Sequence, residues 1–291
     1  MSESTEPDAG EEATAGPRAA VDRVFVVAER ELRTLARNRA LLAVAAAFFA
    51  VVVGLAGAAT GSPGGYVSLT FDLLLPVEVL VPAVAFAFAY RTVQGDGERG
   101  ELAVFRTYPL TRLEYVLGVF VGRASGVLVV VLASLAVAGV VAGTGAEQPV
   151  SFFASHSAGD TPVVFARFAL FAAGYALVAT ALAVAVSAAV GTTRGALGGS
   201  VAALVALAVG FDLALVAAVS GGFVDAGSIA VFAGFSPASA FRGLVFELAL
   251  APALATPSVA TASPAASVVG LLVWLVVGLG GAALAAWPDT G

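Results

Sequence analysis

The chain has 291 residues, of which 59% are hydrophobic and only 12% are charged, about half the charged fraction of an ordinary soluble domain. It has no Cys and one His, His156, which excludes thiol chemistry, thiolate metal sites and sites built from several histidines. All 14 basic residues are Arg, and without Lys the chain has neither a phosphate-binding P-loop nor Schiff-base chemistry. We therefore expect an integral membrane protein that is not an enzyme and holds no cofactor or metal of its own.

Two segments precede the first apolar stretch. Residues 1–20 are acidic and rich in small residues, a composition that predicts a disordered tail. Residues 21–39 repeat apolar side chains such as Val21, Phe25 and Leu32 at helical spacing, with Arg and Glu between them. This pattern predicts an amphipathic helix that lies on the membrane surface.

The remainder, residues 40–288, is expected to be a polytopic transmembrane domain of the all-α class. The first apolar stretch has 20 residues without a charge, which at 1.5 Å per residue matches the ~30 Å hydrocarbon layer. Residues 219–263 are apolar but interrupted, and we expect outer-surface or re-entrant helices there, with a seventh span as the alternative. The six predicted spans cover about 40–59, 71–90, 117–143, 167–190, 196–218 and 265–287.

The Arg residues set the expected orientation. Twelve of the 14 fall on the N-terminal side of the six-span topology, and only Arg167 and Arg242 fall on the other. The positive-inside rule then places the N-terminus, the 91–114 loop and the 191–195 turn in the cytoplasm of a multi-pass cell-membrane protein. No basic groove for nucleic acid is expected.

Small residues in the third span are spaced for close helix contact. Gly118, Gly122 and Gly126 form two overlapping GxxxG steps. Two interpretations are open, packing within the chain and a seam between two copies.

The loop after the second span carries the most informative pattern. Its spacing predicts one short helix from Glu98 to Arg106, with Leu102 and Phe105 on a shared face. Pro109 would end that helix, and Thr111 can cap the next one. A stiff, projecting helix between two spans suits the groove of a soluble partner, whereas the alternative is a plain solvated loop helix.

This loop resembles a known family. Glu98, Gly100, Leu102 and the run Tyr108-Pro109-Leu110-Thr111-Arg112 are similar to the stretch between the second and third spans of type-2 ATP-binding-cassette (ABC) transporter permeases. The chain departs from that pattern at Glu101, where the family usually has Thr, and at Thr107, where Ser is common.

Two further segments resemble the same family. Glu29-Arg30-Glu31-Leu32-Arg33 is similar to its N-terminal elbow helix, and Ser236-Pro237 with the following Arg242 is similar to its outer segment before the last span. Among subgroups, the chain looks most like the NosY-like permeases that work beside copper-enzyme maturation systems.

The resemblance implies the type-2 ABC permease fold and a permease subunit that works as a homodimer or heterodimer. Each permease would dock on a separate cytoplasmic ATPase, which binds the ATP, through a coupling helix at 98–106. Glu98 and Arg106 would make charged contacts in the ATPase cleft. The implied coupling residues are Glu98, Gly100, Leu102, Phe105, Arg106, Pro109 and Arg112.

Glu78 and Asp212 lie inside predicted spans, where a charge is unfavourable unless paired. Helical rise places Glu78 roughly 20 Å and Asp212 roughly 27 Å from the cytoplasmic edge. Pro82 removes the hydrogen bond to the Glu78 carbonyl and should kink the second span. With Arg167 as the candidate partner of Glu78, these residues form a candidate substrate path or gate, or else a structural contact between helices.

The sequence is also compatible with two other functions. A secondary transporter driven by an ion gradient would use Glu78 and Asp212 and should show internal repeats, which we do not find. A membrane scaffold could dock an ATPase without moving a substrate. His156 is expected to be a solvated loop residue, with a metal contact as the alternative.

Overall fold

The computed structural model describes residues 17–59, 65–105, 107–145, 160–254 and 262–286. Every regular element in these ranges is helical, as a bilayer requires of a chain that must satisfy its own backbone groups. In chain order the elements are α1 (Pro17–Arg37), α2 (Arg39–Ala59), α3 (Tyr66–Ala89), α4 (Thr92–Glu98), α5 (Glu101–Phe105), α6 (Arg112–Gly145), α7 (Pro162–Ala189), α8 (Thr193–Val205), η1 (Ala206–Gly210), α9 (Phe211–Ser220), η2 (Ala226–Ser228), α10 (Ile229–Ala233), α11 (Pro237–Leu244), η3 (Val245–Leu250) and α12 (Pro264–Ala286).

Six helical stretches of the described chain are long and apolar enough to cross a membrane, which confirms the predicted number. The second begins at Tyr66 rather than at residue 71, because the Asp160 carboxylate accepts a hydrogen bond from the Val67 amide (3.0 Å) at its first turn. The stretches are Arg39–Ala59, Tyr66–Glu98, Arg112–Thr144, Pro162–Ala189, Thr193–Ser220 and Pro264–Ala286.

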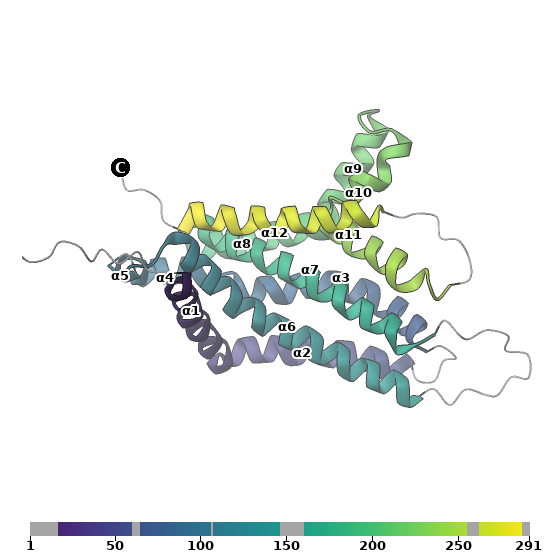
Figure 1. Ribbon diagram of the computed structural model, residues 1–291, viewed down its shortest axis with the longest axis horizontal. Coiled ribbons are helices and arrows are strands. Elements are labelled where there is room, and N and C mark those ends of the chain that lie inside the picture. Colours follow the sequence, from purple (N-terminus) through teal and green to yellow (C-terminus); the bar gives the residue numbers. More distant parts are fainter. Residues whose placement is uncertain (1–16, 60–64, 106, 146–159, 255–261, 287–291) are drawn as a thin grey trace, which may run out of the picture.

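The bundle is built around α3 and α7. In the most apolar 18-residue segment of each span, 61% of the residues are buried for α3 and 50% for α7. The corresponding shares are 17% for α2 and 6% for the span formed by α8, η1 and α9. Figure 1 shows α2, α3, α6, α7 and α12 running along the long axis of the molecule. Between α7 and α11, the rings of Tyr175 and Phe241 are stacked 5.1 Å apart.

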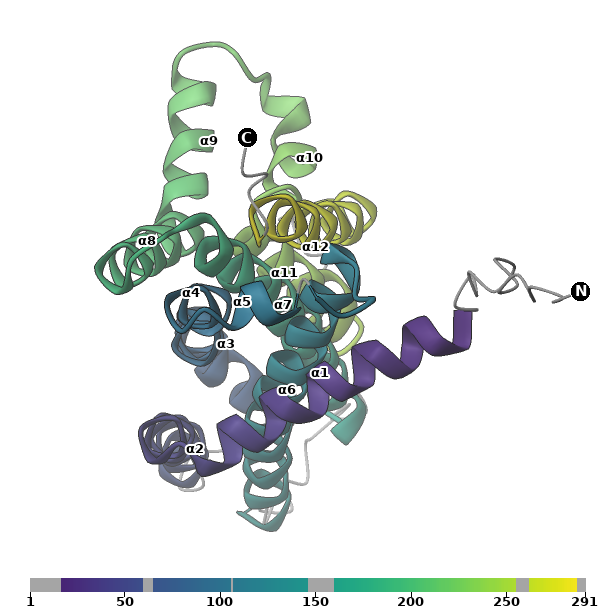
Figure 2. The same cartoon turned by 90° about the vertical axis from the view of Figure 1, so that its left-hand side faces the viewer.

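The fifth span bends. The π-helical segment η1 separates α8 from α9, and α9 leans away from the bundle together with α10 (Figures 1 and 2). A π-helical turn changes the hydrogen-bond register of a helix and so redirects it. After α10, the short helices α11 and η3 return to pack on α12, α7 and α3. The described part of 219–263 therefore consists of short helices rather than a seventh span; residues 255–261 lie outside the described ranges.

The predicted tail and surface helix have different bounds in the structure. The first helix begins at Pro17, which suits a first helical position because its missing N–H has no partner to lose there. It ends at Arg37, and the Asn38 side-chain oxygen then accepts hydrogen bonds from the amides of Ala40 (3.0 Å) and Leu41 (3.4 Å) to begin α2. Residues 1–16 of the predicted tail, and His156, lie outside the described residues.

The helix α1 lies across one end of the bundle and packs on α6 along Gly118, Gly122 and Gly126 (Figure 2). An added Cβ would lie 2.5 Å from Val27 Cβ at Gly118 and 2.5 Å from Glu31 Cβ at Gly122. At Gly126 it would lie 2.6 Å from Leu35. Packing within the chain is therefore the correct interpretation of this seam, with α1 as the partner.

The single helix predicted from Glu98 to Arg106 is wrong. Glu98 is the last residue of α4, and a second helix, α5, starts at Glu101. Gly100 lies between them with φ +73°, a left-handed conformation that glycine adopts without steric penalty and that ends a helix. The segment therefore consists of two short helices that meet at Gly100.

Candidate functional site

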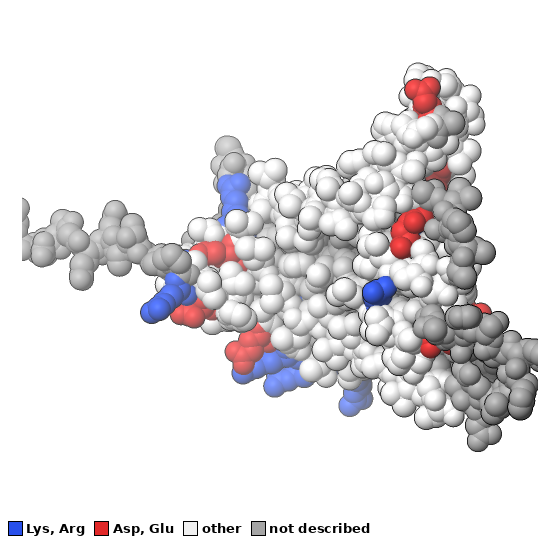
Figure 3. All heavy atoms as spheres, turned by 45° about the vertical axis from the view of Figure 1, so that its right-hand side comes forward, with Lys and Arg blue, Asp and Glu red and all other residues white. Residues whose placement is uncertain are grey.

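The two short helices α4 and α5 lie at the same end of the molecule as α1 (Figure 1). On the face seen in Figure 3, Arg side chains lie mainly toward this end, while Asp and Glu side chains lie toward both ends. The elements there are joined by several ion pairs.

Asp96, in α4, is the centre of these contacts. Its side chain is 2% exposed, and its carboxylate accepts hydrogen bonds from Arg30 Nη2 (2.5 Å), Arg99 Nη2 (2.5 Å) and the Tyr115 hydroxyl (2.7 Å). Arg30 belongs to α1 and Tyr115 to α6. One buried carboxylate therefore ties the short helix to two long ones.

Glu31 extends the network toward the bundle. It is 3% exposed and accepts from Arg30 Nη2 (2.6 Å) and from Arg123 Nε of α6 (2.7 Å). Arg123 also donates to the Phe88 carbonyl of α3 (3.0 Å). A buried acid needs such cations, because an unpaired charge is strongly unfavourable in an apolar interior.

The helix α5 joins the same network at its first residue. Glu101 accepts from Arg30 Nη1 (3.0 Å) and from Arg99 Nε (2.6 Å), and the Arg30 guanidinium lies 5.0 Å from the centre of the Phe105 ring. The hydrogen bond from Arg99 holds the pKa of Glu101 below its usual value. Burial lowers the pKa of Arg30, but Asp96 and Glu31 outweigh it and leave this pKa raised, so Arg30 stays charged.

The start of α6 is a capping box. The Thr111 hydroxyl accepts from the Glu114 amide (3.2 Å), and the Glu114 carboxylate accepts from the Thr111 amide (2.8 Å). This confirms the predicted cap. Glu114 is also bonded to Arg23 Nη2 of α1 (2.5 Å), so α1 is fixed to α6 a second time.

The predicted coupling residues take different places in this arrangement. Glu98 accepts hydrogen bonds within the chain, from Thr193 and Arg91. Leu102 and Phe105 pack inward together, the Phe105 ring 5.5 Å from that of Tyr115, as their spacing predicted. Of the other four, Gly100 lies between α4 and α5, Pro109 is exposed after α5, and Arg112 is the first residue of α6. Arg106 lies outside the described residues.

The clustering of Asp96 with Arg30, Glu31 and Arg123 was not predicted from the sequence. One signal was available, because Arg123 falls inside an apolar span and an arginine there needs an acidic partner. Which acid supplies it could not be read from spacing, since Glu31 lies 92 residues away.

A second charged cluster lies deeper in the bundle. Arg242 of α11 donates to Asp212 of α9 (2.5 Å) and lies 3.4 Å from Glu78 of α3, whose side chain is 5% exposed. The hydroxyls of Ser236 (3.0 Å) and Ser239 (2.6 Å) also donate to Asp212. The structure thus brings the two predicted membrane acids to one cation.

The expected pairing of Glu78 with Arg167 is wrong. Arg167 instead donates to the backbone carbonyl of Leu248 in η3 (3.1 Å). The Arg distribution predicts both Arg167 and Arg242 on the outer side. Arg242 is the one that reaches Glu78, because α11 packs back against α3.

The Glu78 carbonyl has the changed hydrogen bonding that Pro82 predicts. Pro82 has no N–H to donate to the carbonyl four residues earlier, and the Tyr175 hydroxyl of α7 donates to it instead (3.3 Å). Pro76 and Pro82 both lie inside α3 without ending it, because α7 and the other neighbouring helices enclose α3.

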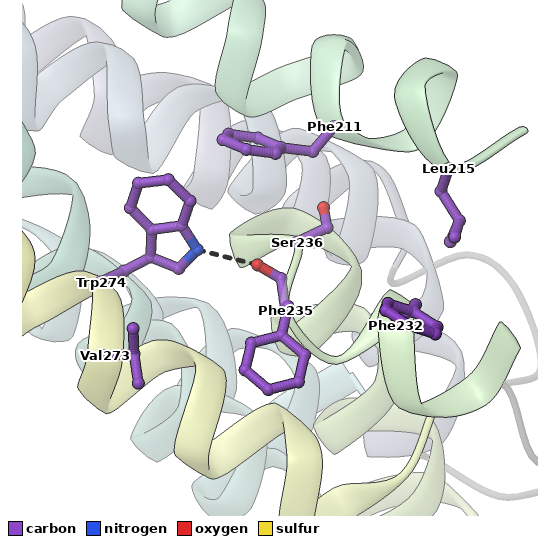
Figure 4. Close-up of a pocket in the computed structure, with 7 residues that line it drawn as sticks. All are labelled: Phe211, Leu215, Phe232, Phe235, Ser236, Val273 and Trp274. Atoms are coloured by element: carbon purple, nitrogen blue, oxygen red, sulfur yellow. Dashed lines mark hydrogen bonds between the residues drawn. The ribbon is translucent and has the colours of Figure 1, made fainter. Parts of the chain in front are cut away.

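A shallow apolar pocket of about 250 Å³ adjoins this cluster between α9, α10 and α12 (Figure 4). Trp274 lines the pocket, with its ring 5.0 Å from that of Phe211. Its Nε1 donates a hydrogen bond to the Phe235 carbonyl (2.8 Å). Ser236 connects pocket and cluster, because it lines the one and donates to Asp212 in the other. No group of three or more His, Cys, Asp or Glu side chains in the described ranges is arranged to hold a metal.

Comparison with known proteins agrees with this architecture. The chain is 35% identical over 133 residues to a "Probable ABC transporter permease protein NosY" of Stutzerimonas stutzeri, covering 42% of this chain and 48% of that protein. It is 36% identical over 117 residues to the protein of the same description from Pseudomonas aeruginosa, covering 38% and 42%. The chain thus matches somewhat less than half the length of these curated relatives. Residues 25–285 match the family described as "ABC-2 family transporter protein", and the chain therefore belongs to this family of multi-pass membrane proteins.

Proposed function

We propose that this chain is the permease subunit of an ABC transporter and that a separate ATPase subunit drives it through α4 and α5. The observation that carries the proposal is the contrast between these two helices. The helix α5 has no buried residue, whereas Asp96 in α4 is bonded to α1 and α6. A partner that docks on α5 can therefore move the long helices through a rigid connection.

The composition of the chain supports the division of labour. Without Lys, the chain has no P-loop to hold the phosphates of ATP, so hydrolysis belongs to a partner. On the exposed side of this segment, Val104 and Tyr108 are 57% and 63% exposed, which offers apolar area to a protein surface.

The same proposal includes orientation and assembly. The N-terminus and α4–α5 lie in the cytoplasm, as the Arg distribution favours, because the ATPase is a soluble protein. A second permease, identical or related, completes the membrane pathway. In the span formed by α8, η1 and α9, only 6% of the residues in the most apolar segment are buried. Its exposed apolar side chains can therefore contact that second permease or lipid.

Co-purification tests the docking. A tagged ATPase encoded beside this chain should retain the full-length permease in detergent, and reordering residues 101–105 should abolish retention while the permease still elutes as a folded species. Unchanged retention of the reordered chain, with unchanged ATP hydrolysis, would refute docking through α5. Substrate movement into liposomes then separates a permease from a scaffold that only docks the ATPase.

We further propose that the cluster of Glu78, Asp212 and Arg242 acts as a gate on the membrane pathway, with Pro82 providing a flexible point in α3. The support is that Arg242 of α11 pairs with Glu78 in the middle of α3 and with Asp212 in the first turn of α9, so α11 moves away from these two helices only when its ion pairs open. Arg167 holds the neighbouring η3 through Leu248. Glu78→Gln should impair transport in liposomes without loss of expression, and normal transport by this variant would rule the gate out.

A further inference from the structure

The short helix α4 is held at both ends by the connection between α7 and α8. At its first turn, the Ser187 hydroxyl at the end of α7 accepts hydrogen bonds from the amides of Val93 (3.2 Å) and Gln94 (3.3 Å). At its last residue, the Glu98 carboxylate accepts from the Thr193 amide (3.2 Å) and the Thr193 hydroxyl (3.1 Å) at the start of α8.

These contacts satisfy groups that a helix leaves unpaired. The first amides of any helix have no partner inside it. For α4 the oxygen comes from Ser187 of α7, and for α8 it comes from Glu98 of α4, aided by Thr192, which accepts from the Gly195 amide (3.1 Å). A carboxylate at a helix N-terminus is also favoured by the helix dipole. Separating α4 from the α7–α8 connection would leave amides at both helices without acceptors.

The first turns of α8 have few other contacts to fix them. Only Ala196 and Ser200 are buried along α8, and the fifth span as a whole is the least buried of the six. By contrast α7, on the other side of the connection, is packed over half its apolar window. The bonds that Glu98 accepts from Thr193 therefore join the packing of α8 on α7 and α3 in setting the position of the fifth span at this end.

From this geometry we propose that α4 passes motion from the docked ATPase into the fifth span, and that Glu98 is the positioning residue that holds α8 to α4. The proposal rests on the proposed function, since it assumes docking on α5. It reverses the role expected for Glu98, which acts inside this chain rather than in the ATPase cleft. Force on α5 reaches α8 by way of Gly100, α4 and Glu98.

The proposal can be tested with spin labels, because the chain has no Cys and engineered cysteines are its only thiols. Labels are placed at Arg194 on the first turn of α8 and at Phe25 on α1, both of which are exposed. Labelled chain is diluted with unlabelled chain so that each measured distance lies within one copy. The complex with its ATPase is measured in lipid nanodiscs, without nucleotide and with a non-hydrolysable ATP analogue.

The expected result is a nucleotide-dependent change of this distance in the otherwise unaltered complex and its loss in Glu98→Ala, with the ATPase still bound. Glu98→Gln should keep the change, because its amide oxygen can still accept from Thr193. Glu29→Ala is the matched control, since it removes an exposed, ion-paired acid of α1 that touches neither α4 nor α8.

Three outcomes would overturn the proposal. A normal distance change in Glu98→Ala shows that the contact transmits nothing, and loss of ATPase binding in that variant makes Glu98 a docking residue. Failure of the unaltered chain to bind the ATPase removes the proposed function and this inference together, which distinguishes it from the first two. If Glu98→Ala does not fold, Thr193→Val removes the hydroxyl contact alone and should reduce the change; an undiminished change would again refute the proposal.

Discussion

At Asp96 one carboxylate accepts hydrogen bonds from groups contributed by α1, by α6 and by the joint after α4. Hydrogen bonds to charged groups contribute about 1.5–3 kcal/mol, so Asp96→Ala should measurably lower the melting temperature of the permease in detergent. Hydrogen exchange should also become faster in α1, because Arg30 loses its most buried acceptor. Asp96→Asn should lose less, since its amide oxygen still accepts from Tyr115.

The control for this prediction is the ion pair between Glu29 and Arg33 on the outer face of α1 (2.5 Å), which is exposed on both sides. Exposed pairs contribute about 0–1 kcal/mol, so Glu29→Ala should leave the melting temperature nearly unchanged. An equal fall in melting temperature in Asp96→Ala and Glu29→Ala would mean that the buried contacts of Asp96 stabilise the permease no more than an exposed ion pair does.

Glycine at 122 gives a second prediction at this scale. An alanine Cβ there would lie 2.5 Å from Glu31 Cβ and 2.7 Å from the Ala28 carbonyl oxygen, so α1 must shift away from α6. Alanine favours a helix over glycine by about 1 kcal/mol, yet Gly122→Ala should lower the melting temperature. Gly174→Ala in α7, where no atom lies within 4 Å of the added Cβ, should raise it or leave it unchanged. A stabilised Gly122→Ala would contradict the close packing.

Single residues were predictable where their partners are near in sequence. Thr111 caps α6 as predicted, and Leu102 and Phe105 share a face. Asp96 was missed because Arg30 lies 66 residues before it, and nothing in a single sequence specifies which distant arginine folds against it.

At the scale of elements, α11 depends on Arg242. Removing only the cation leaves the acids Glu78 and Asp212 near each other in the membrane, which typically costs about 3–5 kcal/mol, whereas replacing a whole buried ion cluster can be nearly neutral. Arg242→Met should therefore destabilise the permease, and adding Glu78→Gln and Asp212→Asn should restore much of the melting temperature. If the triple variant is no more stable than Arg242→Met, the three charges do not act as one unit.

Elements were predictable from hydropathy except where backbone geometry decides. The helix expected at 98–106 is two helices because Gly100 takes a left-handed conformation, and the sequence alone did not distinguish this glycine from Gly95 or Gly97 nearby. The bend at η1 falls in a span without Pro, so the commonest sequence signal for a kink was missing.

At the scale of the whole molecule, orientation can be tested from outside the cell. In the chain without native Cys, Ala103→Cys lies at the charged end and Thr161→Cys at the start of α7 on the opposite end, and both positions are exposed. A thiol reagent that cannot cross membranes should label Thr161→Cys in intact cells and Ala103→Cys only after the cells are opened. The reverse pattern would invert the orientation that the positive-inside rule favours.

The number of spans was predictable from the sequence, but their arrangement was not. The two most buried spans, those of α3 and α7, are the least apolar of the six. The reason is that interior spans hold polar groups such as Glu78, Thr180 and Ser187 that lipid would not tolerate. Hydropathy therefore detects contact with lipid, while the centre of the bundle is specified by pairs of residues far apart in the chain.

The pairing of Glu78 with Arg242 has a consequence for how the protein is made. Arg242 follows Glu78 by 164 residues, so the ribosome delivers the acid long before its cation. At about 5–20 residues per second, roughly 10–30 s pass between the two. During that interval Glu78 of the second span lacks the cation that it pairs with in the folded protein, and this ion pair can form only after α11 has been made.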